Sequence, residues 1–125
     1  MDYLVLSKSA WRISSQELAQ HLRARWPDAT LQEVSGPDSE SLRFKLKMAH
    51  SELWGSLYHQ GQGVFFEGDL DDIAEVALWF RSLAPSSAPL LFCDEAMNGS
   101  LELEPGTTRE DIFQLYGYTP STQEG

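Results

Sequence analysis

The clearest hydrophobic pattern in this chain is an alternation over residues 42–48, where Leu, Phe, Leu and Met alternate with Arg, Lys and Lys. Successive side chains of a β-strand point to opposite faces, so the pattern predicts a strand with one buried face and one wet face. Six further segments have the apolar character and flanking turn residues of strands. They are residues 3–6, 30–35, 53–59, 64–67, 89–93 and 101–104.

Two of the three predicted helices begin with a capping signal. Ser14 and Glu17 have the spacing of a capping box ahead of a helix at residues 16–26, which Pro27 ends. Thr108 and Asp111 have the same spacing ahead of a short final helix.

A third helix, expected to be capped by Asp69, has a continuous apolar stripe that predicts packing against the sheet. The stripe consists of Leu70, Ile73, Val76, Ala77, Phe80 and Leu83. Asp71, Asp72 and Glu75 are expected on its other side, near the positive end of the helix dipole.

The expected element order is β-α-β-β-β-β-α-β-β-α, which has too few helices for a doubly wound parallel sheet. We therefore predict an α+β fold: a mostly antiparallel sheet of about five to seven strands, two longer helices and one short C-terminal helix. Turns are expected at residues 36–39, 61–63 and 98–99. Residues 1–117 should form a single domain, and residues 118–125 a polar, flexible tail.

Composition is that of a globular chain. Of the 125 residues, 42% are hydrophobic, and the longest apolar stretches, residues 76–80 and 89–93, fall far short of the roughly 20 needed to cross a bilayer. The N-terminus has no basic region followed by an apolar one, so neither a signal peptide nor a membrane anchor is expected. The single cysteine, Cys93, fits a reducing compartment, and we expect a cytoplasmic protein.

Charge divides the chain into two unlike halves. Residues 1–60 hold seven acids and seven bases, whereas residues 61–125 hold twelve acids and two bases, so the second half carries the entire net charge of -10. This field should repel nucleic acid and anionic membranes, and it should attract a basic protein surface. The alternative is that the acids only keep a small domain soluble.

Signals for catalysis or metal binding are weak. The three histidines, at positions 21, 50 and 59, lack the spacing of metal ligands, and Cys93 lies in an apolar strand where a thiol is unreactive. Asp94 and Glu95 are the one candidate carboxylate pair, although two solvated acids at a strand end are the ordinary expectation. We expect no enzyme activity, no metal and no cofactor.

Two acidic features suggest a protein-binding surface. Trp79 falls on the same side of its helix as Asp72 and Glu75, which would make it an anchor rimmed by acids; alternatively, it packs under a neighbouring element. Glu102 and Glu104 share one strand face beside Asp94 and Glu95. The predicted partner-binding residues are Asp71, Asp72, Glu75, Trp79, Asp94, Glu95, Glu102 and Glu104.

The last third of the chain resembles small bacterial immunity proteins of polymorphic toxin systems, including contact-dependent inhibition and Rhs-type effectors. The similarity lies in a strand ending in acids at residues 91–95, an acidic strand, and a Pro-Gly-Thr lead into a short helix at residues 101–112. Such proteins typically bind the toxin domain of the same locus and occlude its active site, without catalysis or cofactor.

These observations together predict an immunity protein. It would neutralise a cognate toxin by covering a basic active-site or substrate-binding surface with its acidic second half. An alternative is an acidic secretion chaperone that binds an effector. Such chaperones commonly act as dimers, but this chain begins with a strand ahead of its first helix and has no clear apolar segment for dimerisation. A third is an enzyme built on Asp94 or Glu95, which requires a cleft holding a carboxylate of raised pKa.

Overall fold

The computed structural model describes residues 2–34, 42–49, 51–58, 62–96 and 98–118. Its elements follow the predicted order, and most predicted boundaries fall within one or two residues. The strands and helices are β1 (Asp2–Ser7), α1 (Ser15–Arg25), β2 (Thr30–Glu33), β3 (Leu42–Lys47), β4 (Glu52–Tyr58), β5 (Gly63–Glu67), α2 (Leu70–Leu83), β6 (Leu90–Asp94), β7 (Ser100–Leu103) and α3 (Arg109–Leu115).

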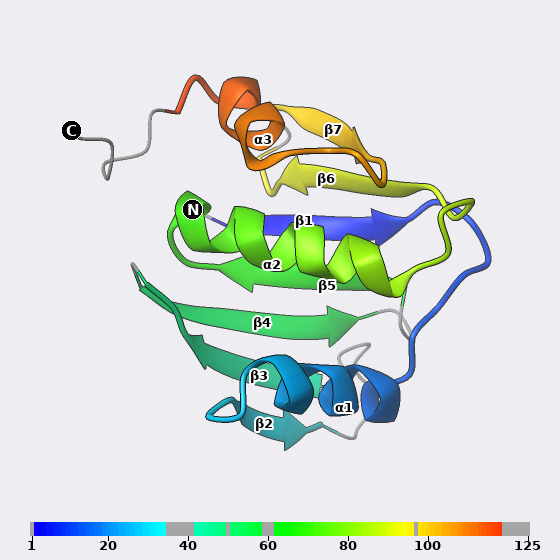
Figure 1. The fold of residues 1–125 in the computed structure, drawn as a ribbon, viewed down its shortest axis with the longest axis vertical. Helices are drawn as coiled ribbons and strands as arrows, with labels where there is room; N and C mark the ends of the chain where they lie inside the picture. The colour runs from blue at the N-terminus through cyan, green and yellow to red at the C-terminus, as the bar shows by residue number, and fades with distance from the viewer. Residues whose placement is uncertain (1, 35–41, 50, 59–61, 97, 119–125) are drawn as a thin grey trace.

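The seven strands form one open sheet in the order β2-β3-β4-β5-β1-β6-β7, and every neighbouring pair is antiparallel. Figure 1 shows the three described helices on one side of this sheet, with α1 over β2 and β3, α2 over β5 and β1, and α3 beside β6 and β7. The predicted α+β class, with an antiparallel sheet, two longer helices and a short C-terminal helix, is confirmed.

Both predicted capping boxes are present. The Glu17 backbone N–H donates to the Ser14 hydroxyl at 3.0 Å, and the Ser14 N–H donates to the Glu17 carboxylate at 3.1 Å. Thr108 and Asp111 exchange the same two bonds at 3.2 and 2.9 Å. Each pair satisfies backbone donors that the first turn of a helix leaves without a partner, so these short segments specify where α1 and α3 begin.

Asp69 occupies the N-cap position of α2, as predicted, but its side chain makes no capping hydrogen bond. Ser51, at the start of β4, is the hydroxyl that ties this turn together. Its oxygen accepts a bond from the Asp69 N–H at 3.3 Å and donates one to Asp72 at 2.7 Å. The beginning of α2 is therefore anchored to the sheet.

The core lies between the sheet and the helices. Apolar side chains from the covered face of the strands meet those of α1, α2 and α3 there, and the largest fully buried ones are Phe66, Phe92, Leu18, Leu22, Leu42, Leu46, Leu53, Leu57, Ile73, Leu90, Leu103 and Ile112. Gly55 makes room for the Phe44 ring, because a Cβ at this position would lie 2.1 Å from its tip. A side chain at position 55 would displace a buried aromatic ring.

The hairpin predicted around residues 98–99 is present, since β6 and β7 pair directly, although the connection is longer than a two-residue turn. Tyr118, expected to begin a flexible tail, instead packs its ring against Phe113 at 5.2 Å. The turn predicted at residues 36–39, residue 61 of the connection predicted at 61–63, and residues 119–125 lie outside the described residues. Within the described part of the chain, no helix combines the length and apolar character that a membrane crossing requires.

Candidate functional site

Asp94, at the end of β6, is fully buried, so the expectation that it is a solvated strand-end acid is wrong. Its carboxylate accepts bonds from the backbone N–H groups of Asn98 and Gly99, at 3.1 and 2.9 Å, and from the Tyr116 hydroxyl at 3.3 Å. Burial alone would raise the pKa of Asp94, but these donors outweigh it and hold the pKa below its usual value. Asp94 therefore lacks the raised pKa that the catalytic alternative requires.

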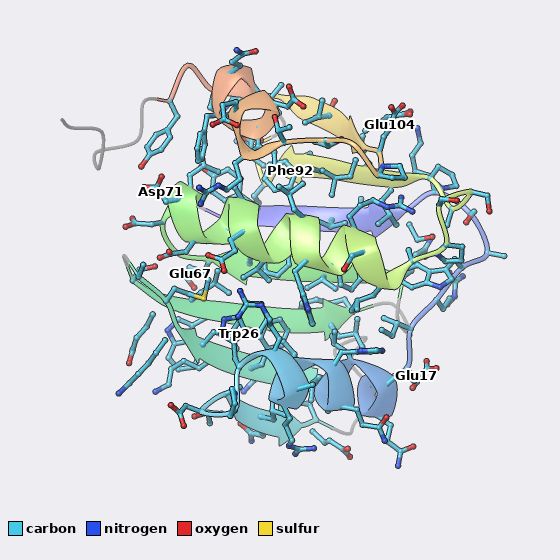
Figure 2. All side chains as sticks on the ribbon, in the orientation of Figure 1. Glu17, Trp26, Glu67, Asp71, Phe92 and Glu104 are labelled. Atoms are coloured by element: carbon cyan, nitrogen blue, oxygen red, sulfur yellow. The ribbon has the colours of Figure 1, made fainter. Side chains whose placement is uncertain are left out.

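Asp71 and Asp72 are also buried, at 7% and 2% exposure, and the expectation that they lie on an open side of α2 is wrong. The Tyr118 hydroxyl donates to Asp71 at 2.6 Å, and Ser51 donates to Asp72. Figure 2 shows Asp71 at the N-terminal end of α2. The segments that carry Ser51 and Tyr118 cover these two acids. The periodicity of the helix sequence cannot show that such segments pack there.

Trp79 packs under a neighbouring element, which was the alternative to its role as an exposed anchor. Its ring meets that of Trp26 edge to face, with centroids 5.0 Å apart, and Figure 2 shows Trp26 just beyond the end of α1. Glu75 forms an ion pair with Arg25 at 2.9 Å across the same gap. This part of the predicted surface therefore joins α1 to α2.

The buried cation Arg81, near the end of α2, is only 5% exposed. Its guanidinium donates to the carbonyls of Ala88, at 2.6 Å, Leu103, at 3.2 Å, and Pro85. Arg81 therefore holds the loop before β6 and the end of β7 against the helix. It also cannot offset the exposed acids of the second half.

The remaining predicted acids are exposed along the β7 side of the sheet. Together with an exposed acid of α3 they form what we call the acidic edge, which consists of Glu95, Glu102, Glu104 and Glu110. Glu102 pairs with Lys8 at 2.8 Å, and this hydrogen bond and the lysine charge lower the pKa of Glu102. Glu104 follows β7 directly, at the side of the molecule away from Trp26 (Figure 2).

The hairpin does not gather all of these acids. Glu102 lies opposite Leu91, so Glu95, the residue after the end of β6, is four residues further along the chain, about 13 Å away at 3.3 Å per residue. The acidic edge is thus an extended strip along an edge strand. Charges on an edge strand also discourage pairing with another chain, which is the ordinary structural role of such a strip.

The other side of the sheet carries a surface that the sequence analysis missed. Trp54, 49% exposed, is the only large hydrophobic residue of the described chain that is classed as exposed. It lines a hollow of about 430 Å³ together with Arg43, Ser56, Tyr58, Phe65 and Glu67. The Lys45 ammonium lies 5.1 Å from the centre of the Trp54 ring, and the rings of Tyr58 and Phe65 meet edge to face.

Register explains this hollow. Ser56 pairs with Phe65, and Trp54 pairs with Glu67, so alternate residues of β4 and β5 project to the side away from the helices. We call this side the open face. The available signal was the alternation in residues 53–59, with Trp54 and Tyr58 out of phase with the buried leucines; the position of Phe65 beside them required the strand register.

A second hollow, of about 650 Å³, lies among Tyr3, Leu70, Asn98, Leu115, Tyr116, Gly117 and Tyr118. Two of its three tyrosines, Tyr116 and Tyr118, donate to the buried acids. Burial and Asp94 raise the pKa of Tyr116, and the bond to Asp71 raises the pKa of Tyr118 to about 12. Both phenols are therefore neutral donors that satisfy carboxylates, which is a structural role.

The described residues contain no group of three or more His, Cys, Asp or Glu side chains placed to hold a metal ion. Burial raises the pKa of the Cys93 thiol, with Asp94 adding to the effect. Comparisons with protein-family models, curated proteins and solved structures found no match to this chain. Two exposed surfaces, the acidic edge and the open face, are the candidate binding sites of the described chain.

Proposed function

We propose that this chain is an immunity protein that binds and neutralises a cognate bacterial toxin domain in the cytoplasm. The acidic edge covers a basic active-site or substrate-binding surface of the toxin. The interaction is between proteins and needs no nucleic acid, membrane, metal or cofactor. The resemblance of residues 91–112 to immunity proteins supports the class of function, and the charge of the described surface supports the mode of binding.

One observation carries the proposal: the exposed charge of the second half is almost entirely negative. Arg81, one of its two bases, is buried against carbonyl groups, which leaves Arg109 as the exposed base. Glu95, Glu104 and Glu110 are exposed along the acidic edge. A strip of this kind steers a basic partner and accelerates its association.

The edge also has a fixed shape. Arg81 anchors the end of β7, Asp94 closes the β6–β7 connection, and the Thr108 capping box sets the start of α3. The exposed acids are therefore presented on a framework that is rigid before the partner arrives, which reduces the entropy lost on binding.

The open face favours a second candidate, an acidic secretion chaperone that holds an effector protein. Chaperones of this kind commonly act as dimers, and the open face supplies an apolar surface that no single segment of the sequence revealed. Trp54, Tyr58 and Phe65 come from two strands and become one surface only in the folded sheet.

Binding to the protein encoded by the adjacent gene, measured over a range of salt concentrations, tests the acidic edge. The double variant Glu104→Gln/Glu110→Gln removes two exposed charges of the edge, and Asp28→Asn/Glu33→Gln removes two exposed charges elsewhere as a matched control. We expect the edge variant to associate about tenfold more slowly at low salt, with a weaker salt dependence, and the control to bind normally.

Equal affinity and equal salt dependence for the edge variant and the unsubstituted chain would overturn the electrostatic mode of binding. A cell-growth assay tests the function itself, because an immunity protein protects cells that express the toxin. A neighbouring gene product that is secreted intact with the help of this chain, and that is harmless when expressed alone, would instead identify a chaperone.

A further inference from the structure

The centre of the open face is apolar across four neighbouring strands. β4 and β5 contribute aromatic residues, and β1 and β6 contribute Leu4, Leu6 and Leu91, which share rows with them: Phe65 pairs with Leu4, and Leu6 pairs with Leu91. An antiparallel sheet that is wet on one side normally presents polar residues there. The open face thus has an aromatic half and an aliphatic half, and no described helix covers either.

The two margins of the same face carry opposite charges. Arg43, Lys45 and Lys47 project from β3 on one side of the apolar centre, where the Lys45 ammonium lies 4.0 Å from the Glu52 carboxylate. Glu95 and Glu102 of the acidic edge lie on the other side. One row shows the contrast: it runs from Lys45 through Trp54, Glu67 and Asp2 to Glu95, whose N–H binds the Asp2 carbonyl. When a second copy is rotated by 180° and laid on this face, the basic margin of each copy lies opposite the acidic margin of the other.

We propose that the occupant of the open face is a second copy of this chain. A two-fold axis parallel to the strands, between β5 and β1, places the aromatic half of each copy on the aliphatic half of the other. Phe65 then meets Leu4, Tyr58 meets Leu91, and Lys45 comes near Glu95 of the second copy. Two sheets packed this way form an aligned sandwich, in which strand directions differ by about 30°.

The dimensions of the face predict a moderate affinity. Seven strands about 4.8 Å apart and about five residues long span roughly 34 by 17 Å, or about 570 Å² in plan. Stable interfaces bury about 800 Å² per partner, so we expect dissociation in the micromolar range. Glu67 and Asp2 meet like charges near the axis, but at the rim of the face, where water solvates them.

Charge complementarity and self-complementary halves distinguish a second copy from an unrelated partner. An unrelated protein would have to present an acidic, an apolar and a basic zone in the order that matches this face. A second copy of the chain, rotated by 180°, presents its zones in that order. The inference does not depend on the proposed function, since it concerns the chain alone.

Sedimentation and light scattering of the purified chain, from about 1 µM to about 1 mM, test the dimer directly. We expect the mass to rise from one chain to two. Trp54→Glu should raise the dissociation constant at least tenfold, because this axis places Trp54 opposite Glu95 of the second copy, and the substitution sets two acids against each other. Gln20→Glu adds the same charge on the exposed side of α1 and should leave association unchanged.

A charge exchange tests the orientation. Lys45→Glu and Glu95→Lys should each weaken association, because both contacts of each homodimer then join like charges. An equimolar mixture of the two variants should restore association, because both contacts of the mixed dimer join opposite charges. A chain that stays monomeric throughout, or a dimer that Trp54→Glu does not weaken, would overturn the inference. So would a monomeric chain whose Trp54→Glu variant fails to bind the toxin, since the toxin would then occupy the open face.

Discussion

Strands β3 and β1 belong to the same sheet, yet they present different side chains to its open face. β3 presents Arg43, Lys45 and Lys47 there, whereas β1 presents Leu4 and Leu6 there, with Asp2 at its N-terminal end. The margin of the sheet has the charged residues of a surface in contact with water, whereas the centre has apolar residues on both faces, as in a sheet that is covered on both sides. The helices cover only one of them, so the difference between the two strands points to a missing layer.

The covered face, which packs against the helices, differs from the open face in how its polar and apolar groups are satisfied. Its polar groups are all engaged: Asp94 accepts three described bonds, and Arg81 donates to three carbonyls. Its apolar groups are almost fully buried. Substitutions on the covered face should therefore reduce stability and leave association unchanged, and substitutions on the open face should do the reverse.

Substitution of Leu53 should have the largest effect on stability. Leu53 precedes Trp54 in β4 but points to the covered face, so the two neighbouring residues compare the two faces directly. Leu53 is fully buried. Leu53→Ser removes most of the side chain and buries a hydroxyl, so we expect a loss of about 3–5 kcal/mol in the free energy of unfolding. Urea unfolding monitored by circular dichroism measures it. A loss below about 1 kcal/mol would mean that the core is not packed as described.

Asp94→Ala should have the next largest effect. It leaves the backbone donors of Asn98 and Gly99 and the Tyr116 hydroxyl without their acceptor, and we expect the melting temperature to fall by about 10 °C or more. Asp94→Asn, which keeps one acceptor oxygen, should fall between this variant and the unsubstituted chain.

The same aspartate predicts an acid dependence. Its pKa is lowered in the folded chain, so the stability that it provides is complete above the unfolded pKa, near 3.8, and is lost as the pH falls below that value. Melting temperatures measured between about pH 6 and pH 2 should fall less steeply with decreasing pH in Asp94→Asn than in the unsubstituted chain. Equal slopes for the two proteins would show that Asp94 does not contribute to acid unfolding.

Arg81→Met should cost about 2–3 kcal/mol, because the aliphatic part of the side chain is kept while the carbonyls of Ala88, Leu103 and Pro85 lose a charged donor. Arg81→Lys should recover only part of this, since a single ammonium group cannot reach all three carbonyls, which lie on two separate segments. Arg109→Met removes the exposed base of the same half and should change stability by less than about 0.5 kcal/mol. Denaturant unfolding of the three variants compares them directly.

Tyr118→Phe should have a smaller effect, about 1 kcal/mol, through loss of the bond to Asp71. The folded pKa of Tyr118, about 12, lies above the ordinary value of 10.0. Its contribution is therefore complete below pH 10 and is lost as the pH rises toward 12. Melting temperatures across that range should fall less steeply in the phenylalanine variant; an identical decline would place Tyr118 away from Asp71.

Local patterns predicted most of the fold. The alternation in β3 and the capping boxes of α1 and α3 involve residues within a few positions of one another, so the sequence contains all of the information that they need. The acids of α2 were misplaced because their partners, Ser51 and Tyr118, lie 21 and 47 residues away in the chain. Hydrophobic periodicity cannot show such partners.

The candidate sites were harder to predict than the fold, because their positions depend on the pairing register of the strands. Asp94 and Glu95 are adjacent and chemically alike, yet one is buried and the other exposed, because Asp94 faces the helices beside Tyr3. The open face was missed for the same reason: its apolar residues are scattered over four strands, and the continuous apolar runs of β1 and β6 do not show which strands lie beside them. Only the pairing of β4, β5, β1 and β6 brings them together.

Trp54→Ser should have the smallest effect on stability, and it completes the comparison with Leu53→Ser. Trp54 is half exposed and contacts Lys45, so its loss should change the free energy of unfolding by no more than about 1 kcal/mol. Its effect on self-association should still be tenfold or greater, whereas a mild substitution on the covered face, Tyr118→Phe, should leave association unchanged. A Trp54 variant that destabilises the monomer by several kcal/mol would show that the open face is already part of the core, and the contrast between β3 and β1 would then need no second copy to explain it.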